Sequence, residues 1–195
     1  MSLTLRDGTP SDLPALSEIE ARAFPGDRLS RRSLSRFLKR TSPSALRVAE
    51  SDGAVAGYAL VLVRARSSIA RLYSIAVADA ARGRGIGAAL LDDIERLAHG
   101  RGATALRLEV RADNGPAIRL YESRGYVRFA VYPRYYEDGM DALRFERRLG
   151  AGDSSGAAPG DGEEDRSPAT TGGFDPVMAA TSSGSSRSGV AVSGA

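Results

Sequence analysis

A short loop rich in glycine and arginine, residues 82–87, separates two segments of opposite character. The apolar run 72–77 precedes this loop, and residues 86–98 follow it with the spacing of an amphipathic helix. Glycine lets a backbone approach a ligand closely, and the first turn of a helix offers unpaired N–H groups and a dipole that favours an anion. A strand, a loop and a helix in this order therefore predict a site for a phosphorylated ligand.

Two phosphate-binding patterns overlap in this loop. Residues 83–88 fit the loose dinucleotide pattern G-x-G-x-x-A, and the acidic Glu109 lies about 20 residues further on. A dinucleotide site needs its first glycine at the strand-to-helix turn of a leading βαβ unit, whereas residues 78–81 separate the strand from the glycine here. The second pattern, R-x-x-G-x-G, is formed by Arg82, Gly85 and Gly87, and it is the one that we favour.

The composition excludes several kinds of site. The chain of 195 residues has no cysteine and a single histidine, His99. It therefore has no disulfide, no cysteine-based metal site and no acyl-cysteine intermediate, and we expect no metal. We also find no signal-peptide pattern and no apolar run as long as a membrane span, so we expect a cytoplasmic protein that does not contact a membrane.

Charge is unevenly distributed along the chain. Residues 1–149 hold 25 basic and 18 acidic side chains, whereas residues 150–195 hold two basic and six acidic ones. The basic character of residues 1–149 suits binding of a polyanionic cofactor, an acidic partner or nucleic acid. Nucleic acid is the least favoured of these, because aromatic residues make up only 6% of the chain and no RNA-binding motif is present. Some of the excess charge lies on one expected helix surface, where a solvated face is the ordinary explanation: Arg31, Arg32, Arg36, Lys39 and Arg40.

Hydrophobic periodicity divides residues 1–149 into short strands and helices. We expect strands at 3–6, 45–50, 54–63, 69–78, 104–110, 126–132 and 143–149, and helices that begin near Leu13, Ser30, Ile86 and Asn114. A leading hairpin, one β-α-β unit and a closing antiparallel pair predict an α/β fold around a mixed sheet.

Residues 150–195 differ in composition from the rest of the chain. Ten of them are glycine, and Phe174 is the only aromatic residue among them. Such a segment cannot bury enough apolar surface to offset the entropy of ordering it. We therefore expect one folded domain at 1–149 and a disordered tail rich in glycine and serine at 150–195.

A second motif follows the loop. Residues 108–126 read L-E-V-R-A-D-N-G-P-A-I-R-L-Y-E-S-R-G-Y, which places a carboxylate, Glu109, on a strand and a phenol, Tyr121, on a helix. Acyl transfer from a thioester to an amine needs a neutral amine, a stabilised oxyanion and a protonated leaving thiolate. A carboxylate acting through water suits the first task and a phenol the last. Judged alone, Tyr121 is more readily explained as a core aromatic, and Asn114 as the N-cap of the helix after it.

The two motifs together resemble those of the GNAT superfamily of N-acetyltransferases. In that superfamily an R-x-x-G-x-G loop precedes the pattern L-E-V-R-x-x-N-x-x-A-I-x-L-Y-x-x-x-G-[FY]. The chain is most similar to the ribosomal-protein alanine N-acetyltransferase (RimI) branch, and residues 135–142 match its Y-Y…D-A ending. The resemblance covers residues 1–149. It implies a mostly antiparallel mixed sheet flanked by helices, in which the strands at 69–78 and 104–110 splay apart.

The resemblance also implies a role for each matched residue. Acetyl-CoA is the implied cosubstrate, with its pyrophosphate on the backbone of the loop and its pantetheine arm on the edge of the preceding strand. Tyr121 is the implied general acid, Glu109 the implied general base through water, and Tyr135 and Tyr136 the implied contacts of the acceptor. The implied cofactor-binding residues are Ile75, Ala76, Val77, Arg82, Gly83, Arg84, Gly85, Ile86, Gly87 and Asn114.

The identity of the acceptor stays open at this point. A protein or peptide N-terminus is the first interpretation, because an α-amine, with a pKa of about 8, is neutral more often than a lysine side chain, with a pKa of about 10.4. Lysine side chains and small-molecule amines are alternatives, since residues 24–31 are more basic than the branch pattern. A non-catalytic acyl-CoA-binding module is an alternative of another class, although both Glu109 and Tyr121 are present. A monomer and a homodimer are both compatible with the sequence.

Overall fold

The structure, a computed structural model, describes residues 2–24, 28–39 and 44–150. The expected tail lies outside the described residues apart from Gly150, so its disorder stays a prediction. The strands are β1 (Leu3–Asp7), β2 (Ser44–Ser51), β3 (Ala54–Leu62), β4 (Ile69–Val77), β5 (Ala105–Arg111), β6 (Val127–Tyr132) and β7 (Ala142–Arg148). The α-helices are α1 (Leu13–Ala23), α2 (Arg31–Phe37), α3 (Ile86–Gly100) and α4 (Gly115–Ser123). Two short 3-10 helices, η1 (Pro10–Asp12) and η2 (Asp79–Ala81), precede α1 and the loop.

The elements lie within one or two residues of their expected bounds, which is the ordinary uncertainty of helix and strand ends. Helix α3 extends two residues beyond the expected stretch 86–98, to Gly100, and Gly102 then adopts a positive φ of 88°. None of the described helices has the length and apolar character needed to cross a membrane.

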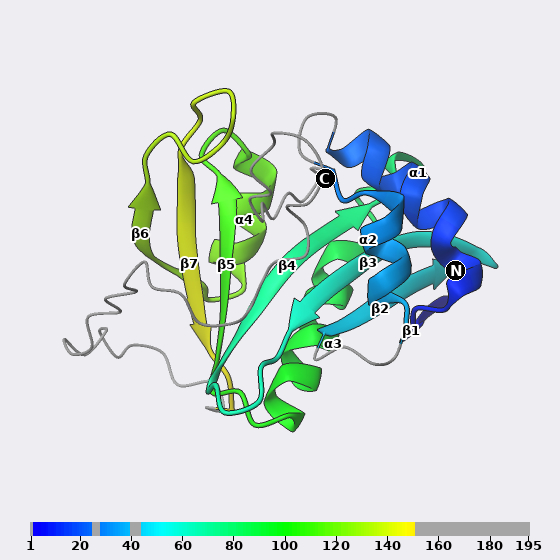
Figure 1. Cartoon of the computed structure of the whole chain (residues 1–195), viewed down its shortest axis with the longest axis horizontal. Helices are drawn as coiled ribbons and strands as arrows, with labels where there is room; N and C mark the ends of the chain where they lie inside the picture. The colour runs from blue at the N-terminus through cyan, green and yellow to red at the C-terminus, as the bar shows by residue number, and fades with distance from the viewer. Residues whose placement is uncertain (1, 25–27, 40–43, 151–195) are drawn as a thin grey trace. The chain divides into compact units, whose positions relative to one another are not determined.

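The seven strands form one mixed sheet in the order β1-β2-β3-β4-β5-β7-β6 (Figure 1). Every neighbouring pair is antiparallel except β4 and β5, which are parallel and connected through α3. The mixed, mostly antiparallel sheet expected from the sequence is therefore confirmed. The single parallel pair lies at the centre of the sheet. Strand β4 contains the apolar run 72–77, and β5 contains the first residues of the second motif.

The central pair splays apart, as expected. Strands β4 and β5 pair only where residues 69–71 meet residues 105–107, and they diverge beyond that point (Figure 1). The register between β3 and β4 also shifts, because Leu60 faces Ser74 while Val61 faces Leu72. Tyr73 is thus the extra residue of a β-bulge, and a bulge bends the strand that carries it. Within the described residues, the later half of β4 pairs with β3 on one side and with no strand on the other.

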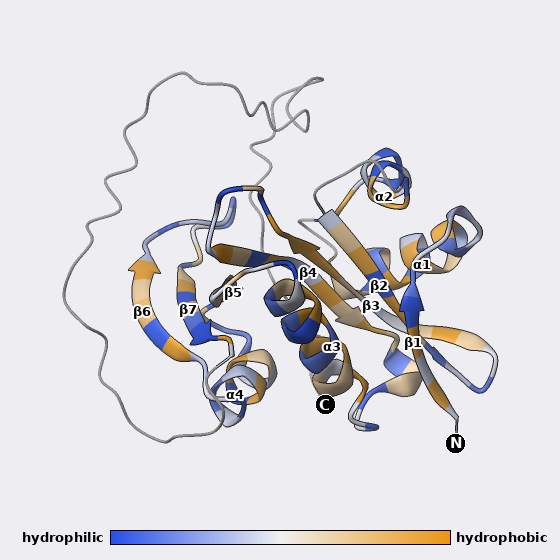
Figure 2. Cartoon of the chain, turned by 90° about the horizontal axis from the view of Figure 1, so that it is seen from below, coloured by the Kyte–Doolittle hydropathy of each residue, from blue (hydrophilic) through white to orange (hydrophobic). Residues whose placement is uncertain are grey.

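Helices lie on both faces of the sheet. Helices α1 and α2 cover one face over the N-terminal strands, and α3 and α4 cover the other face (Figures 1 and 2). On the α3 side, Leu90, Leu91 and Ile94 are fully buried and form one core with alternate residues of the strands. Leu16 of α1 and Leu34 of α2 belong to a second core on the opposite side. This division follows from the two-residue alternation of strand side chains.

One part of the sheet has no covering helix among the described elements. Figure 2 shows that α1 and α2 do not extend over β5, β7 and β6. We call this surface the open face; it carries Arg107, Glu109, Phe129 and Arg144. Leu106, Leu108 and Val110 point the other way into the α3 core, so alternation along β5 directs Glu109 onto the open face.

Candidate active site

The loop before α3 owes its shape to two glycines. Gly83 and Gly85 have φ angles of 71° and 74°, in the left-handed region that L side chains rarely adopt. Gly85 is also the N-cap of α3, and no side chain caps this helix end. The N–H groups of the first turn therefore have no acceptor within the helix, an arrangement that favours an anion. A Cβ at either glycine meets nothing within 4 Å, so the loop leaves room for a ligand.

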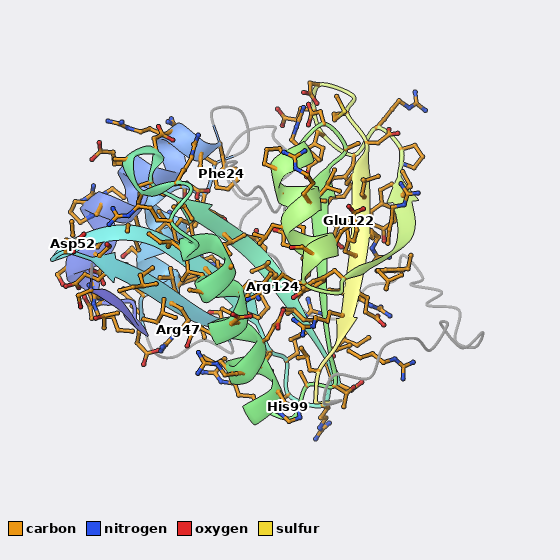
Figure 3. All side chains as sticks on the ribbon, turned by 180° about the vertical axis from the view of Figure 1, so that it is seen from behind. Phe24, Arg47, Asp52, His99, Glu122 and Arg124 are labelled. Atoms are coloured by element: carbon orange, nitrogen blue, oxygen red, sulfur yellow. The ribbon has the colours of Figure 1, made fainter. Side chains whose placement is uncertain are left out.

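The arginines of the loop bind neighbouring turns of the protein. Arg84 pairs with Asp52 in the β2–β3 turn at 3.0 Å, and Arg82 pairs with Asp79 in η2. Figure 3 shows Asp52 on this turn. The two side chains thus brace the loop from both sides. A phosphate held here would rest chiefly on backbone N–H groups, including those of Ile86 and Gly87, which agrees with the role that the resemblance implies for residues 82–87.

The strand before the loop presents a free backbone edge. Ile75, Ala76 and Val77 pair with residues 57–59 of β3, and their side chains are buried. On the β5 side these residues pair with no described strand, so this edge of β4 has no ladder partner there. An extended amide-containing chain can pair with such an edge as an added strand would, which fits the pantetheine arm of an acyl-CoA.

Helix α4 begins with a side-chain cap. The Oδ1 atom of Asn114 accepts a hydrogen bond from the backbone N of Ala117 at 3.2 Å, which is the geometry of an N-cap. At the other end of the helix, Arg124 donates to the backbone O of Ala88 at 3.2 Å and pairs with Asp92. Figure 3 shows Arg124 between α4 and α3. These contacts fix α4 beside the helix that follows the loop, while the contact of Asn114 with a cofactor stays a prediction.

Tyr121 combines tight packing with a hydroxyl that has no partner. Its side chain is 0% exposed, and its ring centroid lies 5.6 Å from that of Tyr126 and 6.2 Å from that of Phe145. Within the described residues its hydroxyl makes no hydrogen bond, and such a buried group is costly unless something else satisfies it. Burial, together with the nearby Tyr136 phenol, raises the pKa of Tyr121 well above its usual 10.0. The phenol is therefore protonated at neutral pH, as a proton donor must be.

Glu109 is held between two arginines on the neighbouring strands. Arg71 of β4 donates to its Oε2 through Nη2 at 2.7 Å and through Nε at 3.0 Å, and Arg144 of β7 donates to its Oε1 at 3.3 Å. Glu109 is only 1% exposed. Both carboxylate oxygens thus have protein donors, so Glu109 anchors the middle of the sheet. Its action as a general base through water stays a prediction.

Tyr136 is buried between β5 and the β6–β7 connection. The Cζ atom of Arg111 lies 4.8 Å from the centroid of its ring, a cation–π arrangement. Arg111 also pairs with Asp113 at 3.0 Å and with Asp138 at 2.8 Å. The same arginine thus fixes the end of β5 to the loop that carries Tyr136. Because Tyr136 affects the pKa of Tyr121, the structure brings one expected acceptor contact close to the expected general acid.

Tyr135 is the neighbour of Arg71. Burial alone lowers the pKa of Arg71, but the charge of Glu109 and the contacts with Tyr135 outweigh it and raise that pKa above its usual range. The ring of Tyr135 also stacks on that of Tyr132 at 5.7 Å and meets the ring of Tyr136 edge-on at 5.3 Å. The structure therefore groups Tyr135 with Glu109 on the open face and groups Tyr136 with Tyr121.

Sequence reasoning missed three arginines of this site: Arg71, Arg111 and Arg144. Arg111 stands inside the L-E-V-R motif, directly after the strand, so its place in the motif was a usable signal. Arg71 and Arg144 carried no such signal, because only the register of β4 and β7 against β5 brings them to Glu109. Among the described residues, no group of three or more His, Asp or Glu side chains is placed to hold a metal ion.

Comparison with protein families gives a match at the same elements. Residues 13–126, from the start of α1 to the residue before β6, match the model of the Acetyltransferase (GNAT) family. The N-alpha-acetyltransferase RimI of Mycobacterium tuberculosis is 36% identical over 147 residues, which cover 73% of this chain and 90% of that protein. An uncharacterized N-acetyltransferase of Methanocaldococcus jannaschii is 36% identical over 142 residues, covering 72% of this chain and 88% of that protein.

Solved structures with the same fold agree with these relatives. The crystal structure of the ribosomal-protein-S18-alanine N-acetyltransferase from Escherichia coli matches with a TM-score of 0.68 and 29% identity, over 80% of this chain and 100% of that one. The ribosomal-protein-alanine N-acetyltransferase from Brucella melitensis matches with a TM-score of 0.67 and 26% identity, over 75% and 99% of the two chains.

Proposed function

The chain belongs to the Acetyltransferase (GNAT) family and is an acyl-CoA-dependent N-acetyltransferase, and we propose that it acetylates the N-terminal α-amine of a protein. The observation that carries the site assignment is the buried hydroxyl of Tyr121, which has no hydrogen-bond partner among the described residues. The choice of an α-amine is supported by the relatives named for N-alpha and ribosomal-protein alanine acetylation.

Three features of the chain fit acetyl-CoA. The uncapped start of α3 with its two left-handed glycines suits the pyrophosphate. The free edge at residues 75–77 suits the amides of the pantetheine arm. The hydroxyl of Tyr121 has no hydrogen-bond partner in the part of the chain that the structure describes, and it can donate to a sulfur atom. Acetyl-CoA supplies the acetyl group as a thioester, and its thiolate is the leaving group.

The proposed roles of the residues follow from these positions. Tyr121 donates the proton that the departing thiolate needs. Glu109, or water held beside it, removes a proton from the acceptor amine. Tyr135 and Tyr136 border the acceptor, since they lie beside Glu109 and Tyr121 respectively. Because the chain has no cysteine for an acyl-enzyme, the amine attacks the thioester directly and the kinetics are sequential.

Changing Gly85 should separate the role of the loop in binding from its role in folding. Asp and Asn have nearly the same volume and both tolerate the left-handed region, and a Cβ here meets nothing within 4 Å. Without ligand we expect the two variants to melt at the same temperature, somewhat below the wild type, because the φ of 74° strains any side chain. Acetyl-CoA at about 100 times its Kd should stabilise the wild type by about 2.7 kcal/mol. G85N should keep part of this shift and G85D none, because its carboxylate repels the pyrophosphate. Stabilisation of the wild type by NAD in place of acetyl-CoA would contradict this assignment of the loop.

Acceptor preference tests the proposed function directly. We expect turnover of acetyl-CoA with peptides that have a free N-terminus, and the release of free thiol measures its rate. The same peptides with a blocked N-terminus and one internal lysine, and the polyamine spermidine, should react at least about tenfold more slowly. Mass spectrometry of the product identifies the acetylated nitrogen. Faster turnover of the blocked lysine peptides or of spermidine would replace the α-amine with one of these acceptors.

A further inference from the structure

Helix α2 carries positive charge without any acidic residue. Arg28, Arg31, Arg32, Arg36 and Lys39 all lie on or beside this helix, and the sequence has no Asp or Glu between Asp27 and Glu50. Arg28, Arg31, Arg32 and Lys39 are exposed. Among the residues that the structure describes, these four side chains form no ion pair.

Arginines elsewhere in the domain differ from those of α2, because most of the other described arginines pair with a carboxylate. The arginines with such a partner are Arg6, Arg22, Arg47, Arg71, Arg82, Arg84, Arg96, Arg107, Arg111, Arg124, Arg144 and Arg147. On α2 and beside it, in contrast, four basic side chains that form no ion pair with any described residue lie close together in a stretch of sequence that supplies no carboxylate.

Two of the basic residues lie at the end of the helix where positive charge is unfavourable. Arg31 and Arg32 occupy the first turn of α2, whose N-cap is Ser30, and this turn has no acidic residue. The helix dipole favours acidic side chains at this end and opposes cations. Residues that break a local rule in a well-formed domain often serve function. The placement of Arg31 and Arg32 therefore favours a role in binding over a role in stability.

The position of α2 connects this charge with the acceptor side of the site. The ring of Phe37, at the end of α2, lies 5.9 Å from the ring of Tyr73 on β4. Two residues before Tyr73 on the same strand is Arg71, which binds Glu109. Helix α2 lies over β2 and β3 (Figure 1), and its C-terminal end reaches β4 two residues beyond the last residue that pairs with β5, on the face that also carries Glu109.

Nucleic acid is a poorer match to this surface than an acidic peptide. Single-stranded nucleic acid is bound by charge combined with free aromatic faces on which bases stack. On the open face, Phe129 has the Cζ atoms of Arg107 and Arg144 over its ring at 5.0 and 4.8 Å. The ring of Tyr132 is stacked on Tyr135. Both rings therefore already contact other side chains of the protein, although Phe129 is 41% and Tyr132 39% exposed.

We propose that the acceptor carries acidic side chains in the residues that follow the acetylated amine, and that Arg31 and Arg32 of α2 select it by charge. This inference rests on the proposed function, because it names a property of the N-terminus that is acetylated. Exposed charges act at range through a field that salt screens. The selection should therefore appear in KM for the acceptor and weaken as the salt concentration rises, with kcat little changed.

The test compares three N-terminal peptides that share their first residue and length and differ at positions two to four, which are acidic, neutral or basic. We expect kcat/KM at low salt to be about tenfold or more higher for the acidic peptide than for the basic one. The variant R31E/R32E should lose or reverse this preference. It should melt no lower than the wild type, because it places acids at a helix N-terminus. The matched control R96E/R101E changes the net charge equally on α3 and should keep the preference.

The possible outcomes separate the two proposals. Equal kcat/KM for the three peptides would overturn the acidic preference and leave N-terminal acetylation standing. A preference that R31E/R32E and R96E/R101E reduce equally would overturn the role of α2. Acetylation of spermidine or lysine side chains but of no N-terminus would overturn both proposals. Binding of a fluorescent single-stranded RNA that R31E/R32E abolishes, with peptide kcat/KM unchanged, would assign α2 to nucleic acid and overturn the inference.

Discussion

Replacing Tyr121 with phenylalanine should lower kcat about 100-fold or more and leave the affinity for acetyl-CoA nearly unchanged. General acid catalysis contributes about 10²- to 10⁴-fold to rates, and this variant removes the acid while it keeps the ring. The hydroxyl has no hydrogen-bond partner among the described residues, so its loss leaves no other polar group unpaired. We therefore expect a melting temperature equal to or above that of the wild type. Steady-state kinetics, acetyl-CoA titration and thermal melting measure the three quantities.

Tyr126 offers a matched control for this variant. Its ring packs against that of Tyr121, but its hydroxyl donates to Glu95 Oε1 at 2.7 Å. Y126F leaves this buried carboxylate without one of its donors and should cost about 1–3 kcal/mol of stability, with little change in kcat. A Y121F enzyme that keeps its kcat and loses stability would instead identify Tyr121 as a core aromatic, and the proton donor would have to be another group.

The raised pKa of Tyr121 adds a pH prediction to the first one. Burial and Tyr136 shift its pKa above 10.0, so the phenol keeps its proton throughout the range in which an α-amine becomes neutral. The rate of the wild type should therefore rise with pH up to about pH 9 and not fall through loss of the acid. A decline between pH 8 and 9, absent in Y121F, would mean that the phenol titrates at a lower pH than its burial implies.

The secondary structure was predictable because local signals agreed along the chain. In α3 the helical spacing of Ile86, Leu90 and Ile94 coincides with a glycine start, and all three side chains are buried. Asn114 followed by Gly115 and Pro116 predicted the start of α4 in the same way. Periodicity and capping depend only on neighbours in sequence, so they can be recognised without the fold.

Features that depend on strand register were not predictable from periodicity. The β-bulge at Tyr73 has no sequence signal of its own, and the early end of the β4–β5 pairing was expected only from the resemblance to a known family. Arg71 and Arg144 approach Glu109 only because two different strands flank β5. The hydroxyl of Tyr121 could be read either as catalytic or as buried in the core. The structure shows that it is buried and, within the described ranges, without a hydrogen-bond partner, which the spacing of α4 alone does not reveal.

Replacing Glu109 with glutamine should lower kcat about 100-fold at pH 7, and the deficit should shrink as pH rises. If the carboxylate takes the proton from an acceptor α-amine with a pKa of about 8, it is needed only while that amine is charged. At pH 9 most of the amine is already neutral, so we expect the ratio of wild-type to variant rates to fall below about 10. Rates from pH 6.5 to 9.5 at saturating acetyl-CoA measure this ratio.

The ion pairs of Glu109 require that its structural role be measured alongside the kinetic one. Glutamine leaves Arg71 and Arg144 without their common carboxylate, and breaking a fully buried pair costs about 3–5 kcal/mol. We expect a smaller loss of about 1–3 kcal/mol, because the Arg71 side chain is 39% exposed. E146Q is the matched control, since Glu146 pairs with Arg107 at 2.6 Å on the same face but has no proposed part in the reaction. It should lose some stability and keep its rate.

The shape of the pH profile then decides the role of Glu109. A rate deficit that is constant from pH 6.5 to 9.5, together with the loss of stability, would make Glu109 an anchor that positions Arg71 and Arg144 and not a base. The base would then be sought among Tyr135, Tyr136 and Glu137, of which Tyr135 already lies beside Arg71. If the rate deficit of E109Q shrinks as pH rises and E146Q has no rate deficit, a purely structural role of Glu109 does not explain the result. Protein packing does not respond to the protonation of an acceptor amine, so only a group that removes the proton produces that profile.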